Sequence, residues 1–281
     1  MSHDFGNIDA WTKDKLDKVR DYLDAYLIAL KNQNFRLEYI DAFAGTGYVT
    51  RKFNVAPQTL FELEETVTLK DFIDGSARVA LQTEPPFAKY TFIEKHVQRC
   101  KELENLKTEF PSLSESIQVI NGEANDFVQQ LCRMDWIDSR RRAVMFLDPY
   151  GTQVSWKTLK AIAETMAIDL WILFPIGTVN RLLNRNGRII EGRRKRLNTL
   201  FGDEIWFDSF YSREESRILF SDVPQEKYIK TASFESIAAY FVDKLRAVFA
   251  DVAPNPLCFA AGNPNGAPIA VRIAKHILGK K

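Results

Sequence analysis

The sequence has few of the residues that build metal centres and disulfide frameworks. Its 281 residues include three cysteines and three histidines, and neither set shows the close spacing of metal ligands. Cys100, Cys132 and Cys258 are widely separated and odd in number, which argues against disulfides and favours a reducing compartment. No signal peptide and no apolar run of transmembrane length are recognisable. We therefore expect a cytoplasmic protein with no metal and no membrane association.

The sequence also lacks an excess of either charge and the usual phosphate-binding motifs. Lysine and arginine number 38 against 37 aspartate and glutamate, so a polyanion would have to be bound by a local basic surface. The G-x-x-x-x-G-K-[ST] motif is absent, and Thr50 replaces the third glycine of G-x-G-x-x-G. These absences argue against a P-loop enzyme and against a dinucleotide-binding turn.

What the chain does contain is a strand that runs into a glycine-rich turn at residues 39–47. The apolar residues and the terminal acid suit a buried strand of a parallel sheet. The two glycines let the backbone turn tightly and approach a ligand. Together they form the D-x-F-x-G-x-G pattern of S-adenosylmethionine (SAM)-dependent methyltransferases. The pattern predicts a cofactor site at Asp41, Phe43, Ala44, Gly45 and Gly47.

Three later apolar runs also end in acidic residues. Glu94 follows one run and could accept hydrogen bonds from both hydroxyls of a ribose, with Lys95 beside it. Glu123 follows the next and, with Ala124, is placed to reach an adenine amino group. Each acid could equally cap the helix that follows it. Four such strand ends on one edge of a sheet favour a SAM site.

The fourth run ends in Asp148-Pro149-Tyr150-Gly151. It resembles the D-P-P-Y motif of nucleobase amino-methyltransferases without its second proline, and the D-P-F-G variant of some tRNA guanine N2-methyltransferases. A carboxylate there can hold an amino group toward the methyl donor, and the tyrosine can stack on a base. The tetrapeptide could also be an ordinary strand-end turn. Cytosine-5 methyl transfer is disfavoured because no cysteine follows a proline.

Helical periodicity follows each strand, and this alternation indicates a parallel, doubly wound sheet. The sequence therefore predicts an α/β fold, the Rossmann-like class I SAM-dependent methyltransferase fold, with two insertions. An insertion at about residues 49–74 makes the first crossover longer than one helix requires. A second, at residues 177–232, is expected to form a helical, arginine-rich subdomain. Residues 1–176 and 233–281 then form the methyltransferase-like domain.

Before the first strand, apolar residues recur at helical spacing from Leu16 to Leu30. The spacing predicts an amphipathic helix over residues 12–31 with Thr12 as its N-cap.

The second insertion carries a basic segment that could neutralise phosphates, followed by aromatic residues that could stack on bases. A solvated helical face over a small aromatic core is the alternative. The candidate nucleic-acid-binding residues are Arg185, Arg188, Arg193, Arg194, Lys195 and Arg196. The aromatic residues are Trp206, Phe207, Phe210 and Tyr211.

Taken together, these segments resemble the three-Cys-motif partner (TcmP) family. The likeness extends over most of the chain, through residues 11–13, 39–45, 74–77, 122–125, 146–151 and 259–263. It implies a methyltransferase-like fold and a partner protein that carries three cysteines and is of radical-SAM type. Tyr150 stands where the family usually has phenylalanine, and Glu123 where aspartate is common.

We therefore expect a SAM-dependent methyltransferase, with SAM as cofactor and a nitrogen of a nucleobase in RNA or DNA as acceptor. The catalytic residues would be Asp148, Pro149, Tyr150 and Gly151. The alternative is a scaffold partner of a three-cysteine protein that keeps the fold without turnover of its own.

Overall fold

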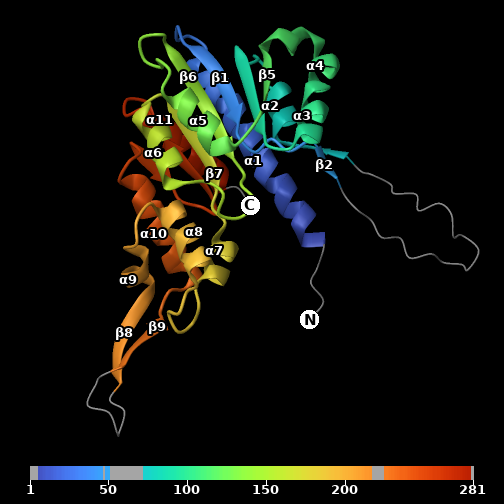
Figure 1. Cartoon of the computed structure of the whole chain (residues 1–281). Coiled ribbons are helices and arrows are strands. Elements are labelled where there is room, and N and C mark those ends of the chain that lie inside the picture. The colour runs from blue at the N-terminus through green and yellow to red at the C-terminus, as the bar shows by residue number, and fades with distance from the viewer. Residues whose placement is uncertain (1–5, 47, 51–71, 217–224, 280–281) are drawn as a thin grey trace, which may run out of the picture.

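The computed structural model describes residues 6–46, 48–50, 72–216 and 225–279. A seven-stranded sheet forms its centre, in the order β10-β11-β7-β6-β1-β4-β5 (Figure 1). Its strands are β1 (Arg36–Asp41), β4 (Lys89–Glu94), β5 (Ile117–Asn121), β6 (Arg141–Leu147), β7 (Ile168–Leu173), β10 (Asp251–Ala253) and β11 (Leu257–Ala261).

The sheet is parallel apart from β11, which runs antiparallel to both of its neighbours, β7 and β10. The chain builds outward from β1 through β4 to β5, and then returns to the other side of β1 with β6 and β7. The direction of winding thus reverses at β1, and a ligand crevice is expected at the carboxyl ends of the strands on either side of such a point. This order confirms the predicted α/β, Rossmann-like fold.

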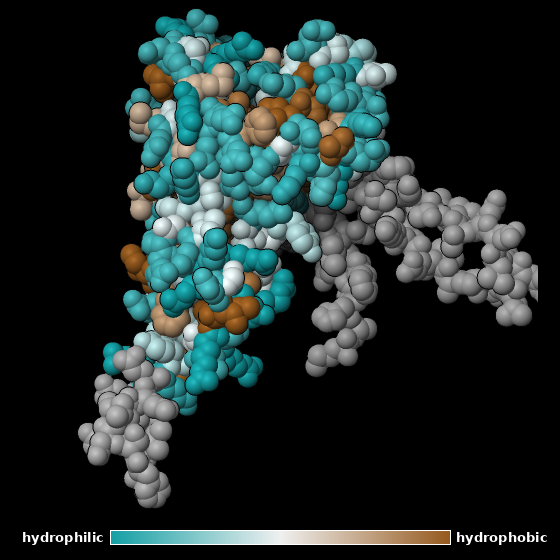
Figure 2. Space-filling model, viewed as in Figure 1, coloured by the Kyte–Doolittle hydropathy of each residue, from teal (hydrophilic) through white to brown (hydrophobic). Residues whose placement is uncertain are grey.

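Helices cover both faces of the sheet, as the buried parallel strands require. The outer surface of the described residues is largely hydrophilic in the view of Figure 2. Alternate residues of a strand point to opposite faces, so Tyr39 and Val144 join one buried cluster while Ile40 and Met145 join the other. The first cluster is covered by α1 (Gly6–Leu30), α2 (Ser76–Leu81), α3 (Val97–Glu104), α4 (Leu106–Glu109) and α11 (Ala267–Leu278). The second is covered by α5 (Ala124–Cys132), α6 (Trp156–Glu164) and α10 (Phe234–Arg246). A 3-10 helix at Pro111–Ser116 precedes β5.

The segment between β7 and α10 lies beyond the carboxyl ends of the strands (Figure 1). It contains α7 (Ile176–Leu182), α8 (Glu191–Phe201) and α9 (Trp206–Phe210), and a hairpin of β8 (Tyr211–Ser216) and β9 (Gln225–Lys230). The sequence did not predict this hairpin, because β8 is polar after its first residue, the buried Tyr211, and lacks the alternation that a buried face imposes.

The first insertion begins and ends in a second hairpin, β2 (Tyr48–Thr50) paired with β3 (Phe72–Asp74). Residues 51–71, most of the segment predicted at about 49–74, lie outside the described residues.

The predicted start of the first helix was wrong. The helix α1 begins at Gly6, so Thr12 lies inside it and is not its N-cap. The apolar stripe was identified correctly, since Val19, Leu23 and Leu27 are buried against the sheet.

A buried ion pair aligns the two central strands. Arg141 of β6 donates from Nε and Nη2 to the two carboxylate oxygens of Glu38 on β1, at 2.8 Å each. Glu38 is buried, and the guanidinium of Arg141 also lies 4.3 Å from the ring centroid of Trp136. Because both partners are paired and bidentate, the pair fixes how the two strands lie beside each other.

The backbone of Gly262, just after β11, packs closely against the backbone of Ile168 at the start of β7. A Cβ atom at this position would lie 2.3 Å from the backbone oxygen of Ile168. We expect Gly262→Ala to lower the free energy of unfolding by about 1–3 kcal/mol, the cost of overpacking. The control is Gly192→Ala in α8, where nothing lies within 4 Å of the new Cβ, and which should be neutral or stabilising by up to about 1 kcal/mol. Denaturant unfolding measures the free energy of unfolding of both variants. Equal changes in the two variants would contradict the close packing of Gly262 against Ile168.

Candidate functional site

The turn after β1 is organised by the side chain of Asp41. Its carboxylate accepts a hydrogen bond from the backbone N–H of Phe43 at 3.1 Å and another from the hydroxyl of Ser76, at the start of α2. Asp41 is itself buried, as is Ala44, whose N–H donates to the carbonyl of Ile93 on β4 at 3.2 Å. Both residues were predicted to bind the cofactor, and the structure places them beneath the turn, where they shape it.

Gly45 stands on the exposed side of the same turn. Its φ of +63° is in the left-handed region, which strains any residue with a Cβ. Nothing lies within 4 Å of the position that a Cβ would occupy, so the backbone borders open space. Gly47, predicted as the second glycine of the site, lies outside the described residues.

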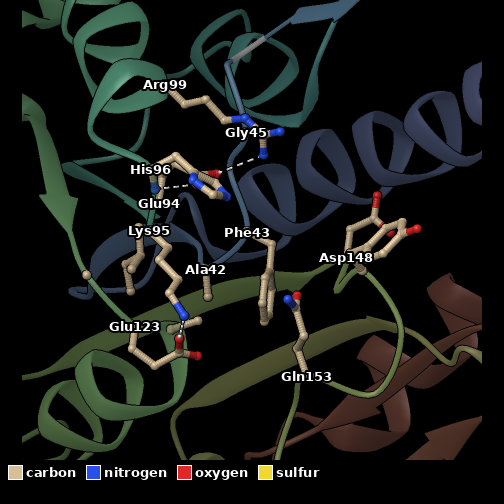
Figure 3. A pocket seen from close by; sticks show the side chains of 14 residues that line it. Ala42, Phe43, Gly45, Glu94, Lys95, His96, Arg99, Glu123, Asp148 and Gln153 are labelled. Atoms are coloured by element: carbon tan, nitrogen blue, oxygen red, sulfur yellow. Dashed lines mark hydrogen bonds and ion pairs between the residues drawn. The ribbon is translucent and has the colours of Figure 1, made fainter.

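The open space is a cavity of about 370 Å³ at the carboxyl ends of β1, β4, β5 and β6 (Figure 3). Its volume lies within the range of small-molecule sites. The lining residues are Ala42, Phe43, Gly45, Ile93, Glu94, Lys95, His96, Arg99, Gly122, Glu123, Ala124, Asp148, Tyr150 and Gln153. The structure therefore brings together eight of the predicted residues: Phe43, Gly45, Glu94, Lys95, Glu123, Ala124, Asp148 and Tyr150. Pro149 and Gly151 belong to the same turn as Tyr150 without lining the cavity.

Glu94 is a buried carboxylate at the end of β4. One oxygen accepts a hydrogen bond from the backbone N–H of His96 at 2.8 Å, and the other lies 3.8 Å from a guanidinium nitrogen of Arg99. These contacts hold the carboxylate at the cavity wall, where its remaining lone pairs can accept further hydrogen bonds.

Lys95 and Glu123 face each other across one side of the cavity (Figure 3). Their ammonium nitrogen and carboxylate oxygen are 3.2 Å apart, and the side chains are 70% and 40% exposed. A pair this exposed contributes little to stability. A ligand that offers better partners can therefore displace it at small cost.

Asp148 is held from the opposite side by a residue that the sequence analysis missed. Lys15 of α1 forms an ion pair with one carboxylate oxygen of Asp148, although 133 residues separate the two. Lys15 is buried and stands four residues before Val19, in register with the apolar stripe of the helix. A lysine at a core-facing position of a helix is costly to bury without a counter-charge. The charged residue within the apolar stripe was the one signal in the sequence that could have indicated a buried acidic partner.

The loop after Asp148 is fixed by Asn125, a second residue without a predicted role. Its amide nitrogen donates to the carbonyl of Gln153 at 2.8 Å. Its amide oxygen accepts from the N–H of Ser155 at 2.9 Å and from the hydroxyl of Thr158 at 2.7 Å. Asn125 thus ties the start of α5 to the loop that carries Tyr150.

Tyr150 stands almost free on this loop. It is 92% exposed, although it lines the cavity, and Gly151 after it has a φ of +72°. An aromatic side chain that is left in water gains nothing from burial within its own fold. It offers a planar face beside the cavity.

The aromatic residues of the second insertion do not have the predicted base-stacking role. Trp206, Phe210 and Tyr211 are buried in the core cluster, and Phe207 is half-buried against it, so none presents a free face for a base. The alternative from the sequence, a small aromatic core beneath a basic face, describes these four residues.

The six predicted basic residues fall into two groups. Arg193 donates to the side chain of Asn184 at 3.1 Å, and Arg194 binds Glu204 at 3.1 Å while its guanidinium lies 4.7 Å from the ring centroid of Phe207. The exposed group consists of Arg185, Arg188, Lys195 and Arg196.

Among the described residues, no cluster of three or more histidine, cysteine, aspartate or glutamate side chains has the geometry of a metal site. Within the same part of the chain, no helix has the length and apolar character needed to cross a membrane.

No protein-family model and no curated protein matches this chain. Three similar solved structures are a Legionella pneumophila protein of the family DUF519, the magnesium protoporphyrin IX methyltransferase of Synechocystis with bound SAH, and TYW2 of M. jannaschii in complex with AdoMet. The first is 12% identical, with 94% of this chain and 91% of that chain covered, and a TM-score of 0.45. The second is 12% identical over 82% and 90%, with a TM-score of 0.33, and the third is 13% identical over 82% and 78%, with a TM-score of 0.25.

Burial raises the pKa of Asp41 to about 7, with the nearby charge of Asp148 adding to the shift and the bonds from Ser76 and Phe43 opposing it. The carboxyl of an unfolded chain has a pKa of about 4, so between about pH 4 and pH 7 the Asp41 carboxyl is protonated more often in the folded state than in the unfolded state. Its contribution to stability is therefore complete below about pH 4 and is lost as pH rises to about 7. We expect Asp41→Asn to remove up to about 1.4 kcal/mol per pH unit from this decline.

The measurement is the free energy of unfolding from pH 4 to 8 by denaturant titration. The exposed Asp138→Asn is the control and should leave the wild-type slope unchanged. Burial also raises the pKa of Asp169, to about 6, so some decline will persist in Asp41→Asn. A slope in Asp41→Asn equal to that of the wild type would contradict the account.

Proposed function

We propose that this chain is a SAM-dependent methyltransferase that methylates a nitrogen of a nucleobase in RNA or DNA. The observation that carries the proposal is the composition of the cavity at the reversal point of the sheet. Its β4 and β5 side presents Glu94 and Glu123, its β1 side presents the backbone of Gly45, and its β6 side presents Asp148 and Tyr150. Nucleoside-binding groups and acceptor-binding groups thus face one space.

The residues of the cavity fit an adenosine-containing cofactor. The free space beside Gly45 admits close approach to the backbone of the turn. Glu94 has the position and the lone pairs to accept hydrogen bonds from ribose hydroxyls, and Glu123 at the next strand end can accept one from an adenine amino group. Lys95, freed from Glu123, would remain beside the ligand. SAM supplies a methyl group on a positively charged sulfur when bound.

The work left to the protein is mainly orientation, because methyl transfer is a direct displacement that requires an in-line nucleophile. The ion pair with Lys15 engages one oxygen of Asp148, which leaves the other to accept a hydrogen bond from an amino group. That bond directs the nitrogen lone pair toward the cofactor. Lys15 acts here as a positioning residue.

The acceptor assignment is supported by the exposed ring of Tyr150 beside Asp148. A base that has left its stack can lie against an aromatic face, an interaction worth about 1–3 kcal/mol per base. Asn125 keeps the loop that carries Tyr150 in place. Arg185, Arg188, Arg193, Arg194, Lys195 and Arg196 remain candidates for phosphate contacts, with the exposed members favoured.

In this proposal, residues 1–176 and 233–281 form the methyltransferase-like domain, and residues 177–232 an inserted subdomain that serves the acceptor. The resemblance to the three-Cys-motif partner family supports a three-cysteine partner for this chain. The alternative function, a scaffold for that partner without turnover, rests on this resemblance alone.

Glu94→Ala removes the proposed ribose acceptor. We expect it to weaken SAM binding by about 1.5–3 kcal/mol, the range for hydrogen bonds to a charged group. Isothermal titration calorimetry with SAM measures the change. The exposed Glu115→Ala is the control and should bind like the wild type. Unchanged affinity in a folded Glu94→Ala protein would remove Glu94 from the site, and no binding by the wild type would refute the cofactor.

The function itself is tested by incubating the protein with methyl-labelled SAM and total cellular RNA, DNA and protein. We expect label in RNA or DNA, reduced about 100-fold in Asp148→Ala, which removes the acceptor that orients the amino group. Label in the protein fraction alone would refute the nucleobase assignment. Label that requires an added three-cysteine companion and survives Asp148→Ala would identify the chain as the scaffold.

A further inference from the structure

A strip of basic side chains leads away from the Tyr150 turn across the second insertion. We define the basic strip as Arg181 of α7, Arg185 and Arg188 of the loop that follows, and Lys230 at the end of β9. The backbone N–H of Lys230 donates to the carbonyl of Arg185 at 2.9 Å, and its ammonium donates to the side chain of Asn180, the neighbour of Arg181. The side-chain amide of Asn184 donates to the carbonyl of Arg188. These contacts bring the four residues close to one another within the insertion.

The strip begins next to the proposed acceptor site. A Cβ on Gly151 would lie 3.8 Å from the methyl carbon of Thr178 in α7. Arg181, one turn later, donates to the hydroxyl of Thr178 at 3.0 Å. The guanidinium of Arg181 is therefore tied to the helix that touches the Tyr150 turn, and it is the basic group of the strip nearest to that turn along these contacts.

Within the described residues, no acidic side chain neutralises the positive charge of the strip. In the described part of the chain, no carboxylate forms an ion pair with any of its four members, and the three arginines are exposed. The pKa of Lys230 is lowered, first by partial burial and then by the positive charge of Arg185. Two cations crowded together without a counter-ion indicate a surface that gains from binding an anion. On α8, in contrast, Arg194 already binds Glu204.

We infer that the basic strip binds the backbone phosphates of a single-stranded nucleic acid whose target base lies on Tyr150. The inference rests on the proposed function and narrows its phosphate contacts to the strip. The strip is preferred to the exposed Lys195 and Arg196 of α8 because Arg181 belongs to the helix that lies against the Tyr150 turn. A line of cations that starts beside an exposed aromatic ring matches the recurring design of single-strand binding surfaces. A duplex fits less well, because its bases cannot reach Tyr150 while they are stacked.

The test measures binding of fluorescein-labelled single-stranded RNA and DNA oligonucleotides by fluorescence anisotropy over a series of salt concentrations. The double variant Arg181→Gln/Arg185→Gln removes two charges from the strip, and Lys195→Gln/Arg196→Gln removes two exposed charges from α8 as the matched control. The plot of log K against log salt has a negative slope, and each lost phosphate contact should reduce its magnitude by about 0.7. We expect the strip variant to lose about 1.4 of slope and about tenfold in affinity for all sequences, with the control unchanged.

Calorimetry with SAM on both variants verifies that the cofactor pocket is intact, and a wild-type affinity there is expected. Three results would overturn the inference: equal losses in the two variants, no loss in the strip variant, or binding of a duplex as tight as that of the single strand. Displacement of the oligonucleotide by polyglutamate at equal charge concentration would also overturn it, by assigning the strip to an acidic protein. A wild type that binds SAM but no oligonucleotide would refute the nucleobase assignment itself. If the strip is shown not to bind phosphates while the wild type still binds the oligonucleotide, the nucleobase assignment is unaffected.

Discussion

The arrangement of the candidate site depends on one buried carboxylate, that of Asp41. It sits at the end of β1, is almost without contact with water, and holds the backbone N–H of Phe43 and the hydroxyl of Ser76 at the same time. The first bond bends the chain into the turn that exposes Gly45, and the second anchors that turn to α2. Burying a carboxylate is costly, and the raised pKa of about 7 records that cost. Burial of Asp41 thus lowers the stability of the fold near neutral pH, while its two hydrogen bonds fix the turn at the cavity wall.

A second constraint is electrostatic and joins the two central strands. Asp41 and Asp148 stand at neighbouring strand ends, close enough for the charge of Asp148 to raise the pKa of Asp41 further. Lys15 reaches this place from α1 and pairs with Asp148, which makes two adjacent carboxylates tolerable. At the other end of the same strands, Glu38 and Arg141 pair bidentately. The Glu38–Arg141 pair therefore aligns β1 with β6 at one end, and the Lys15–Asp148 pair ties α1 to the end of β6 at the other.

The sequence was sufficient for those parts of the structure that local pattern determines. The buried parallel strands read as apolar runs, and the acids at their ends, Glu94 and Asp148 among them, line one cavity because parallel strands end on one edge. Lys15 could not be assigned from local pattern, because its partner is 133 residues away. The β8 and β9 strands were missed because β8 is polar after Tyr211 and the pair carries too little apolar alternation to indicate strands. The role of the aromatic residues in the second insertion was ambiguous in the sequence, since core packing and base stacking use the same side chains. Trp206 and Phe210 are buried, which shows that they serve core packing.

The central claim is that the cavity beside Gly45 binds SAM with its ribose at Glu94 and its purine at Glu123. The most direct measurement is a crystal structure of the protein grown with saturating S-adenosylhomocysteine. The account predicts ribose hydroxyls within hydrogen-bond distance of the Glu94 carboxylate, and the purine beside Glu123 and Ala124, with Lys95 turned away from Glu123. A ligand bound elsewhere on the chain, or an empty cavity at saturating ligand, would contradict it.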